Sequence, residues 1–237
     1  MDFILKYVVF TIKKYDMIKN GDTVAVALSG GKDSLVLLLA LFKIQKYYKI
    51  EFNIKAITLD MCFENKATDF SIVEKFCQEL NIPYTVKLTS LWEIIFVERK
   101  EKNPCSLCSK MRKGILNEVA LQLGCNKIAF GHHKDDAIET IFMNIIYNNK
   151  LKCFSPVTYL SNRDITMIRP LVFCEESHIA NVASKLNLPI KKNKCVADKN
   201  TKRQKMKDML YFVEKNVCKD FGKKFFKSFL DSELSSW

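Results

Sequence analysis

The chain has 237 residues, of which 48% are hydrophobic, so it can bury a sizeable core, and general disorder is excluded. No apolar run approaches the roughly 20 residues that span a bilayer, and the N-terminus lacks the features of a secretory signal. Its 38 Lys and Arg against 26 Asp and Glu give a net charge of +12, which fits either a solvated lysine-rich surface or a face that binds a polyanion.

The predicted elements alternate between helices and strands. Apolar spacing over residues 3–18 indicates an amphipathic helix, and apolar runs predict strands at 23–29, 52–60, 83–89 and 126–132. Helices are expected from about residue 33, over 71–80 and over 135–147. Strands that are apolar almost throughout are typical of a parallel sheet covered on both faces. We therefore expect a doubly wound α/β fold whose ligands gather beyond the carboxyl ends of the strands.

The chain after residue 150 is less regular and more basic. Residues 158–171 predict an extended pair joined by a turn, and residues 175–188 predict a helix with an acidic first turn. The C-terminal region is predicted to be helical, with four aromatic side chains on roughly one side: Phe221, Phe225, Phe226 and Phe229. Such a stripe favours core packing over a nucleic-acid surface.

A six-residue stretch, SGGKDS, lies between the first strand and the helix that follows it. Its glycines allow the main chain to approach a ligand closely, and the N–H groups of a helix N-terminus face an anion. A capped Gly-Gly turn explains the glycines, but it does not explain why a lysine and two serines occur in the same short stretch. The spacing is neither that of P-loop NTPases nor that of dinucleotide folds.

This stretch resembles the PP-loop of the ATP pyrophosphatase superfamily, which is adenine nucleotide alpha-hydrolase-like and has a HUP-like fold. Members split ATP between its α and β phosphates and transfer AMP to a carbonyl oxygen. The resemblance implies that Asp60, which ends the second strand, lies near the adenosine, although a turn residue is its equally weighted alternative. It also implies that six residues hold the pyrophosphate, with Lys32 also catalytic: Ser29, Gly30, Gly31, Lys32, Asp33 and Ser34.

A second polar stretch, GHHKDD, follows the strand at 126–132. Asp135 and Glu139 are four residues apart, so they share one face of the following helix. Two aspartates and two histidines at this end of a strand favour Mg²⁺ coordination or substrate positioning. The stretch also matches the second signature of tRNA-modifying PP-loop enzymes. That match implies nucleotide contacts for Gly131 and His132 and catalytic roles for Asp135 and Asp136.

Nine cysteines without an export signal indicate a reducing, cytoplasmic compartment. Cys105 and Cys108 have CxxC spacing, which lets two thiolates reach one metal, and Cys195 lies in a basic segment. A lone CxxC fits a redox pair, half of a zinc site or a cluster. The other six stand singly beside apolar residues and are expected to be buried: Cys62, Cys77, Cys125, Cys153, Cys174 and Cys218.

Together, SGGKDS, CSLCSKMRKGIL, GHHKDD and IRPL resemble the tRNA 2-thiocytidine synthetase family and its 2-thiouridine relatives over most of residues 20–215. The resemblance implies a 4Fe-4S cluster held by Cys105, Cys108 and Cys195, together with ATP, Mg²⁺, a tRNA substrate, a protein or small-molecule sulfur donor, and a possible homodimer. It divides the chain into an N-terminal helix (1–20), a PP-loop catalytic domain with a CxxC insertion (21–172) and a basic helical region with the distal cysteine (173–237).

The implied reaction starts when ATP adenylates a pyrimidine C2 carbonyl oxygen and releases pyrophosphate. Sulfur from the cluster then replaces that oxygen on a single-stranded or flipped base. CSLC followed by IRPL favours 2-thiocytidine. The alternatives are 2-thiouridine synthesis, a lysidine-like adenylating ligase or amidotransferase with structural zinc, and an RNA-binding protein without chemistry. The expected contacts to the tRNA backbone are cationic: Arg112, Lys113, Lys202, Arg203, Lys205 and Lys207.

Overall fold

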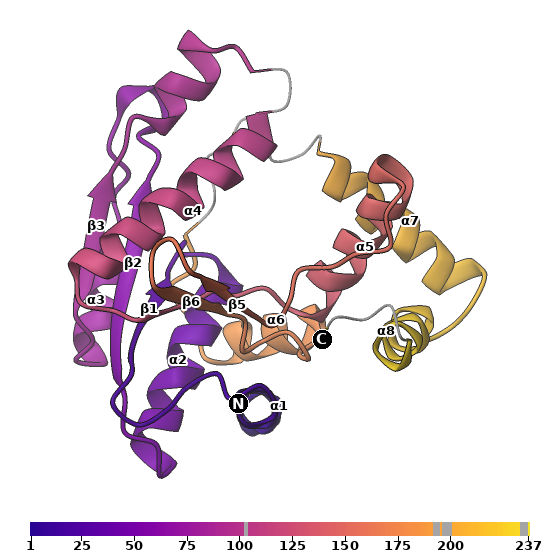
Figure 1. Ribbon diagram of the computed structural model, residues 1–237, viewed down its shortest axis with the longest axis horizontal. Helices are drawn as coiled ribbons and strands as arrows, with labels where there is room; N and C mark the ends of the chain where they lie inside the picture. Colours follow the sequence, from indigo (N-terminus) through magenta and orange to yellow (C-terminus); the bar gives the residue numbers. More distant parts are fainter. Residues whose placement is uncertain (102–103, 192–194, 196–200, 233–236) are drawn as a thin grey trace.

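The computed structural model describes residues 1–101, 104–191, 195, 201–232 and 237. In these residues a six-stranded sheet has the order β3-β2-β1-β4-β6-β5 (Figure 1). Neighbouring strands are parallel except for β5 and β6, which form the antiparallel pair predicted for residues 158–171. The expected doubly wound α/β fold is confirmed. The strands are β1 (Thr23–Ala27), β2 (Asn53–Asp60), β3 (Tyr84–Leu88), β4 (Lys127–Ala129), β5 (Val157–Leu160) and β6 (Ile165–Ile168).

Helices cover both faces of the sheet. Because successive strand residues point to opposite faces, Val24 of β1 packs in one hydrophobic cluster and its neighbour Ala25 in another. The cluster around Ala25 takes its helical side chains from α4 (Pro104–Gln122), among them Leu116. The cluster around Val24 is covered by four helices, α1 (Asp2–Lys14), α2 (Lys32–Tyr47), α3 (Ser71–Glu79) and α6 (Glu176–Lys185).

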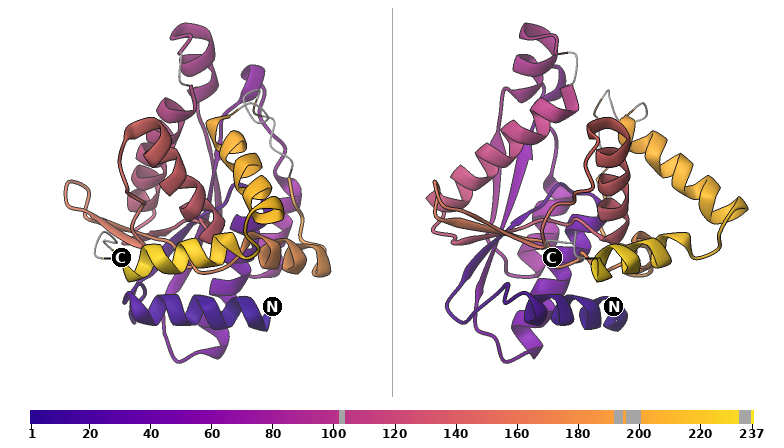
Figure 2. Two further views of the ribbon diagram at one scale, coloured as in Figure 1. Left: turned by 90° about the vertical axis from the view of Figure 1, so that its right-hand side faces the viewer. Right: turned by 45° about the vertical axis from the view of Figure 1, so that its right-hand side comes forward.

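Three further helices lie beside the sheet and form a separate cluster with one another (Figures 1 and 2). These are α5 (Lys134–Asn148), α7 (Lys202–Asn216) and α8 (Phe221–Asp231). Phe226 and Phe229 of α8 are buried in this cluster, which confirms the expectation of core packing. The described part also contains two short helical turns, η1 (Phe63–Asn65) and η2 (Glu93–Glu98).

Residues after 172 also contribute to the main core, because α6 packs against α2. The division of the chain at residue 172 stays a prediction. Among the described residues, no helix combines the length and the apolarity that crossing a bilayer requires.

Candidate active site

The phosphate loop joins β1 to α2, as the sequence predicts. Gly30 has a φ of +78°, a conformation that favours glycine. The Ser34 hydroxyl donates to the Gly31 carbonyl oxygen at 2.9 Å and accepts from the Ser29 amide at 3.2 Å, so the loop is braced from within. Because α2 begins at Lys32, within this stretch, the N–H groups of its first turn can bind an anion there.

The two polar motifs contact each other. A Cβ on Gly131 would lie 3.1 Å from the carbonyl carbon of Asp33, so the absence of a side chain lets the second motif approach the loop backbone this closely. His133 caps α5: its ring accepts from the Asp136 amide at 3.4 Å, and the Asp136 carboxylate accepts from the His133 amide at 3.0 Å. The carboxyl ends of β1 and β4 therefore bring SGGKDS and GHHKDD together, as expected.

Burial and nearby carboxylates set opposite protonation tendencies in the two adjacent histidines. Burial lowers the pKa of His132 to about 3, so its ring is neutral at physiological pH. Burial also opposes the charge on His133, but a hydrogen bond to Asp135 and the charges of Asp136 and Asp33 raise its pKa overall. The carboxylates therefore shift His133 toward the charged form, in which Nδ1 donates instead of accepting, while His132 can only act as a neutral hydrogen-bonding group.

Both aspartates that the sequence suggests for magnesium accept hydrogen bonds from the protein. Asp135 accepts from the Glu176 amide at 2.8 Å, and Asp136 accepts from Arg203 at 2.9 Å. Burial raises the pKa of Glu139, one turn along α5, to about 7, although Arg203 at 3.5 Å opposes this. Within the described ranges, no three His, Cys, Asp or Glu side chains converge on one ion position. Mg²⁺ often takes only one or two carboxylates and completes its shell with waters and phosphate oxygens, so this pair fits a magnesium nucleotide.

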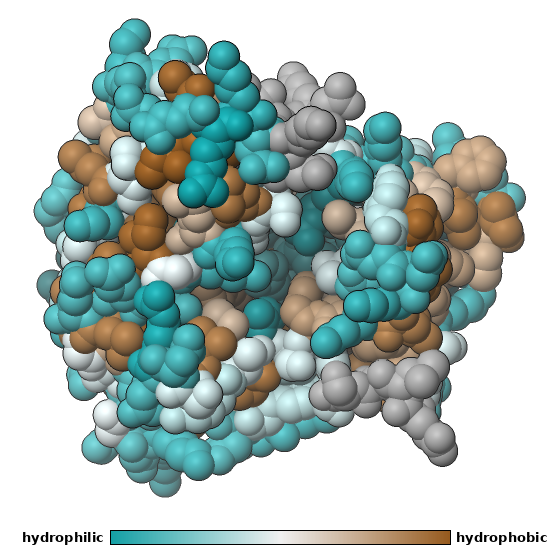
Figure 3. Space-filling view, turned by 45° about the horizontal axis from the view of Figure 1, so that its top comes forward, coloured by the Kyte–Doolittle hydropathy of each residue, from teal (hydrophilic) through white to brown (hydrophobic). Residues whose placement is uncertain are grey.

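One cavity of about 370 Å³ contacts both the phosphate loop and two of the three predicted cluster ligands. The molecule is also hollowed, with a hydrophilic floor, between the parts that carry α4 and α5 (Figure 3). The cavity volume of about 370 Å³ lies in the range of small-molecule sites. The cavity is lined by Ser29, Gly31, Leu59, Asp60, Met61, Phe63, Thr68, Phe70, Cys108, Arg112, Lys191 and Cys195.

Asp60 supports one wall of this cavity. Its buried carboxylate accepts from the Thr68 amide at 2.5 Å, from the Thr68 hydroxyl at 3.0 Å and from the Cys62 amide at 3.0 Å. These bonds hold a turn in which Cys62, Glu64 and Asn65 all have positive φ. The structure thus gives Asp60 a turn-forming role, and its contact with adenosine stays a prediction.

The three cysteines predicted as ligands lie close enough to influence one another. Cys105 is exposed and Cys108 is half-buried, and both belong to the start of α4, three residues apart and therefore on one helix face. Burial raises the pKa of Cys108, Arg112 opposes this, and the charges of Cys195 and Cys105 raise it further. A 4Fe-4S cluster is larger than a single ion, so its ligands stand further apart. Cys108 and Cys195 line the cavity, and Cys105 lies one helical turn before Cys108, so the three residues fit such a cluster.

The other cysteines follow the expectation of burial only in part. Cys77, Cys125, Cys153 and Cys174 are buried, as predicted. The remaining two, Cys62 and Cys218, are only partly buried, because each lies in a turn next to a helix rather than inside an element. No disulfide joins the cysteines that the structure describes.

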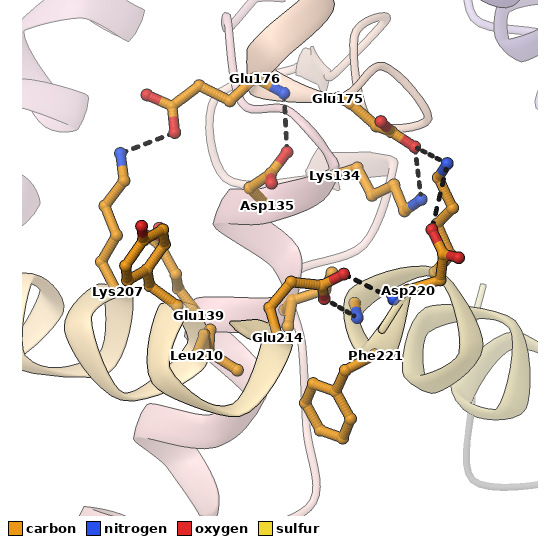
Figure 4. A pocket seen from close by; sticks show the side chains of 14 residues that line it. Lys134, Asp135, Glu139, Glu175, Glu176, Lys207, Leu210, Glu214, Asp220 and Phe221 are labelled. Atoms are coloured by element: carbon orange, nitrogen blue, oxygen red, sulfur yellow. Dashed lines mark hydrogen bonds and ion pairs between the residues drawn. The ribbon is translucent and has the colours of Figure 1, made fainter. Parts of the chain in front are cut away.

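Sequence reasoning did not single out two buried or half-buried charged residues. Glu176 places one carboxylate oxygen 2.9 Å from Lys32 Nζ and the other 2.6 Å from Lys207 Nζ, and Figure 4 shows it reaching toward Lys207 on α7. Arg169 of IRPL is 3% exposed, donates to a backbone carbonyl and lies 5.0 Å over the Phe154 ring. Acidic residues at a helix start predict only capping, so no sequence signal links Glu176 to Lys32.

Comparisons with known proteins agree with this geometry. The family model described as a PP-loop domain matches residues 6–214. A tRNA-cytidine(32) 2-sulfurtransferase of Ralstonia pickettii (strain 12J) is 36% identical over 87% of this chain and 65% of its own length. The enzyme of the same name from Dechloromonas aromatica (strain RCB) is 37% identical over 83% of this chain and 68% of its own length. The chain thus spans about two thirds of the length of these curated relatives.

A solved structure is also similar over nearly the whole chain. It is the U34-tRNA thiolase NcsA from Methanococcus maripaludis with its [4Fe-4S] cluster, at 28% identity and a TM-score of 0.76, and the match covers 97% of this chain and 79% of that one. An NH3-dependent NAD synthetase from Campylobacter jejuni shares the fold at 17% identity, with a TM-score of 0.51 and coverage of 96% and 91%. The expected family resemblance is therefore confirmed.

Proposed function

The chain belongs to the PP-loop domain family, and from this membership we propose that it is an ATP-dependent tRNA sulfurtransferase that makes 2-thiocytidine. One observation carries the proposal: a single cavity contacts the phosphate loop at Ser29 and Gly31 and the predicted cluster ligands at Cys108 and Cys195. A base adenylated at one end of this cavity therefore stands next to a sulfur site at the other. The names of the curated relatives support cytidine as the target.

The phosphate loop performs the activation step. The first-turn amides of α2 and the Lys32 ammonium stabilise the charge that builds on pyrophosphate as the base oxygen attacks the α-phosphorus of ATP. Asp135 and Asp136 would hold Mg²⁺, which would neutralise charge on the phosphates. The adenylated oxygen then leaves as AMP, which is a far better leaving group than an oxide. These steps require the nucleotide, the metal and the base to meet at the phosphate loop.

The cysteines perform the replacement step. Cys105, Cys108 and Cys195 would hold a 4Fe-4S cluster, which would supply the sulfur that replaces the oxygen. Burial raises the pKa of Cys108, and Arg112, which also lines the cavity, opposes this rise and so favours the thiolate that binds iron. We also propose a cytoplasmic location, a protein or small-molecule sulfur donor, and a homodimer.

A second candidate is 2-thiouridine synthesis. The similarity to a U34-tRNA thiolase over 97% of the chain favours it, whereas the higher identity to the curated relatives favours cytidine. The two products differ in mass after digestion to nucleosides, so one assay separates them.

The test is to purify the protein without oxygen, measure iron and acid-labile sulfide, and incubate it with unmodified tRNA, ATP, Mg²⁺ and a sulfide source. We expect 2-thiocytidine by mass spectrometry, and a cluster that is lost in Cys105→Ala and Cys108→Ala but kept in the matched control Cys218→Ala. Lys32→Ala should keep the cluster and lose tRNA-dependent release of pyrophosphate. Stoichiometric zinc without labile sulfide, or a lysidine-like adduct, would refute the proposal.

A further inference from the structure

Glu176 connects the phosphate loop to the basic helix α7. Its two carboxylate oxygens bind different lysines, Lys32 of the loop at 2.9 Å and Lys207 of α7 at 2.6 Å. The hydrogen bonds raise the pKa of both lysines against the effect of burial, so both are charged. Figure 4 shows that this carboxylate lies above Asp135, close to the start of α5. One side chain therefore shares its charge between the nucleotide site and a helix expected to contact RNA.

A second ion pair on the same helix engages the predicted magnesium site. Arg203, four residues before Lys207 and thus on the same face of α7, lies 2.9 Å from Asp136 and 3.5 Å from Glu139. In the nucleotide-free protein, Arg203 neutralises Asp136, one of the two predicted magnesium ligands, and Lys207 neutralises part of the charge of Glu176. Arg203 and Lys207 cannot pair with these protein carboxylates and with RNA phosphates at the same time.

The contact between α7 and the body of the protein is weak enough to be exchanged. Met206 is the one buried residue that the structure describes in this helix, and a cavity of about 360 Å³ separates α7 from parts of α5, α6 and α8. The side chains of Arg203 and Lys207 are 45% and 48% exposed. The cationic side of each ion pair is half exposed to water, which weakens the pair, so competing ligands can replace it.

We propose that Glu176 is a positioning residue that couples nucleotide binding to RNA binding, and this inference rests on the proposed function. When magnesium and ATP bind, the phosphates take Lys32 and the metal takes Asp136. The Glu176 carboxylate then faces phosphate oxyanions, and their repulsion displaces it from the loop. The ion pairs Arg203–Asp136 and Lys207–Glu176 are then lost, and Arg203 and Lys207 become available to the RNA backbone.

The coupling has two measurable consequences in the intact holoenzyme. Binding of unmodified tRNA should tighten about tenfold when Mg²⁺ and α,β-methylene ATP are present, because couplings between sites are typically 5- to 150-fold. The salt dependence should also steepen. Each freed cation that meets a phosphate adds roughly 0.7–0.9 to the slope of log affinity against log salt, so two cations add roughly 1.4–1.8.

The decisive variant is Glu176→Gln, which keeps the size of the side chain and removes its charge. It should bind tRNA more tightly than the wild type without nucleotide, and the nucleotide effect should shrink to less than about threefold. The matched control is Glu175→Gln, because Glu175 pairs with Lys134 and Lys223 and with neither Lys32 nor Lys207. That variant should keep the full nucleotide effect and the full change in salt slope.

Lys207→Gln tests the same link from α7 and covers the case in which Glu176→Gln does not fold. It should also lose most of the nucleotide effect, and its maximum affinity should be lower because one RNA contact is gone. A wild type that makes thiolated tRNA but binds tRNA equally with and without nucleotide overturns this inference and leaves the proposed function standing. A wild type that binds no tRNA in either state overturns both.

Discussion

Glu139 should make the protein less stable as the pH rises, and Glu139→Gln should remove this effect. The carboxyl group is 5% exposed, and burial raises its pKa from 4.5 to about 7 in the folded protein. One pKa unit corresponds to about 1.4 kcal/mol, so the full difference amounts to roughly 3 kcal/mol. Because the folded pKa is raised, the favourable contribution of the protonated form is complete below pH 4.5 and is lost as the pH rises through 7.

The assay is urea denaturation of the reduced, nucleotide-free protein at several pH values from 4.5 to 8. The free energy of unfolding of Glu139→Gln should rise relative to the wild type by roughly 3 kcal/mol across this range. Other titrating groups are common to both proteins and cancel in the difference. Glu118→Gln, at an exposed position of α4, should show a flat difference. A flat difference for Glu139→Gln as well would refute the assignment of a protonated carboxyl group at this position.

Two further substitutions test the site and the core. Gly131→Ala should weaken α,β-methylene ATP binding about tenfold by calorimetry. The new Cβ would lie 3.1 Å from the backbone of Asp33 and 3.2 Å from that of Ser34 and would push on the loop. The control Gly114→Ala should bind the nucleotide normally, because its Cβ would meet nothing within 4 Å. Phe226→Ala should lower the free energy of unfolding, measured in urea, by about 3–5 kcal/mol. The Phe226 side chain is only 4% exposed, and its ring packs against Phe173 and Trp237. A loss below about 1 kcal/mol would contradict a packed C-terminal cluster.

The strand–loop–helix units could be predicted because local sequence determines them. The run TVAVALS becomes β1, and the glycines after it take the backbone geometry that a phosphate loop needs. Helix α4 could not be predicted from periodicity, because its described buried residues lie only in its second half, from Leu116 to Ala120. The strand at 83–89 is present as β3, but it is an edge strand whose Val86 and Leu88 are exposed.

The parts of the site that sequence could not supply are contacts between distant residues. Lys32 and Glu176 are 144 positions apart, and Arg203 and Asp136 are 67 apart. Each pair forms only because β4, α6 and α7 fold back onto the end of β1. Motif matching found Asp136 and Lys32, but the residues that neutralise them in the nucleotide-free protein follow from the packing of helices.

The Lys191 amide donates a hydrogen bond to the Gly30 carbonyl oxygen at 2.9 Å, so the segment that leads to Cys195 starts at the phosphate loop. Cys195 follows Lys191 by four peptide bonds, and a fully extended chain gains at most about 3.6 Å per residue, so its Cα stays within about 14 Å of the anchored residue. While that bond holds, the distal thiol remains tethered to the phosphate loop whatever path the intervening chain takes. A displacement of the phosphate loop therefore also displaces the residue from which the segment to Cys195 starts.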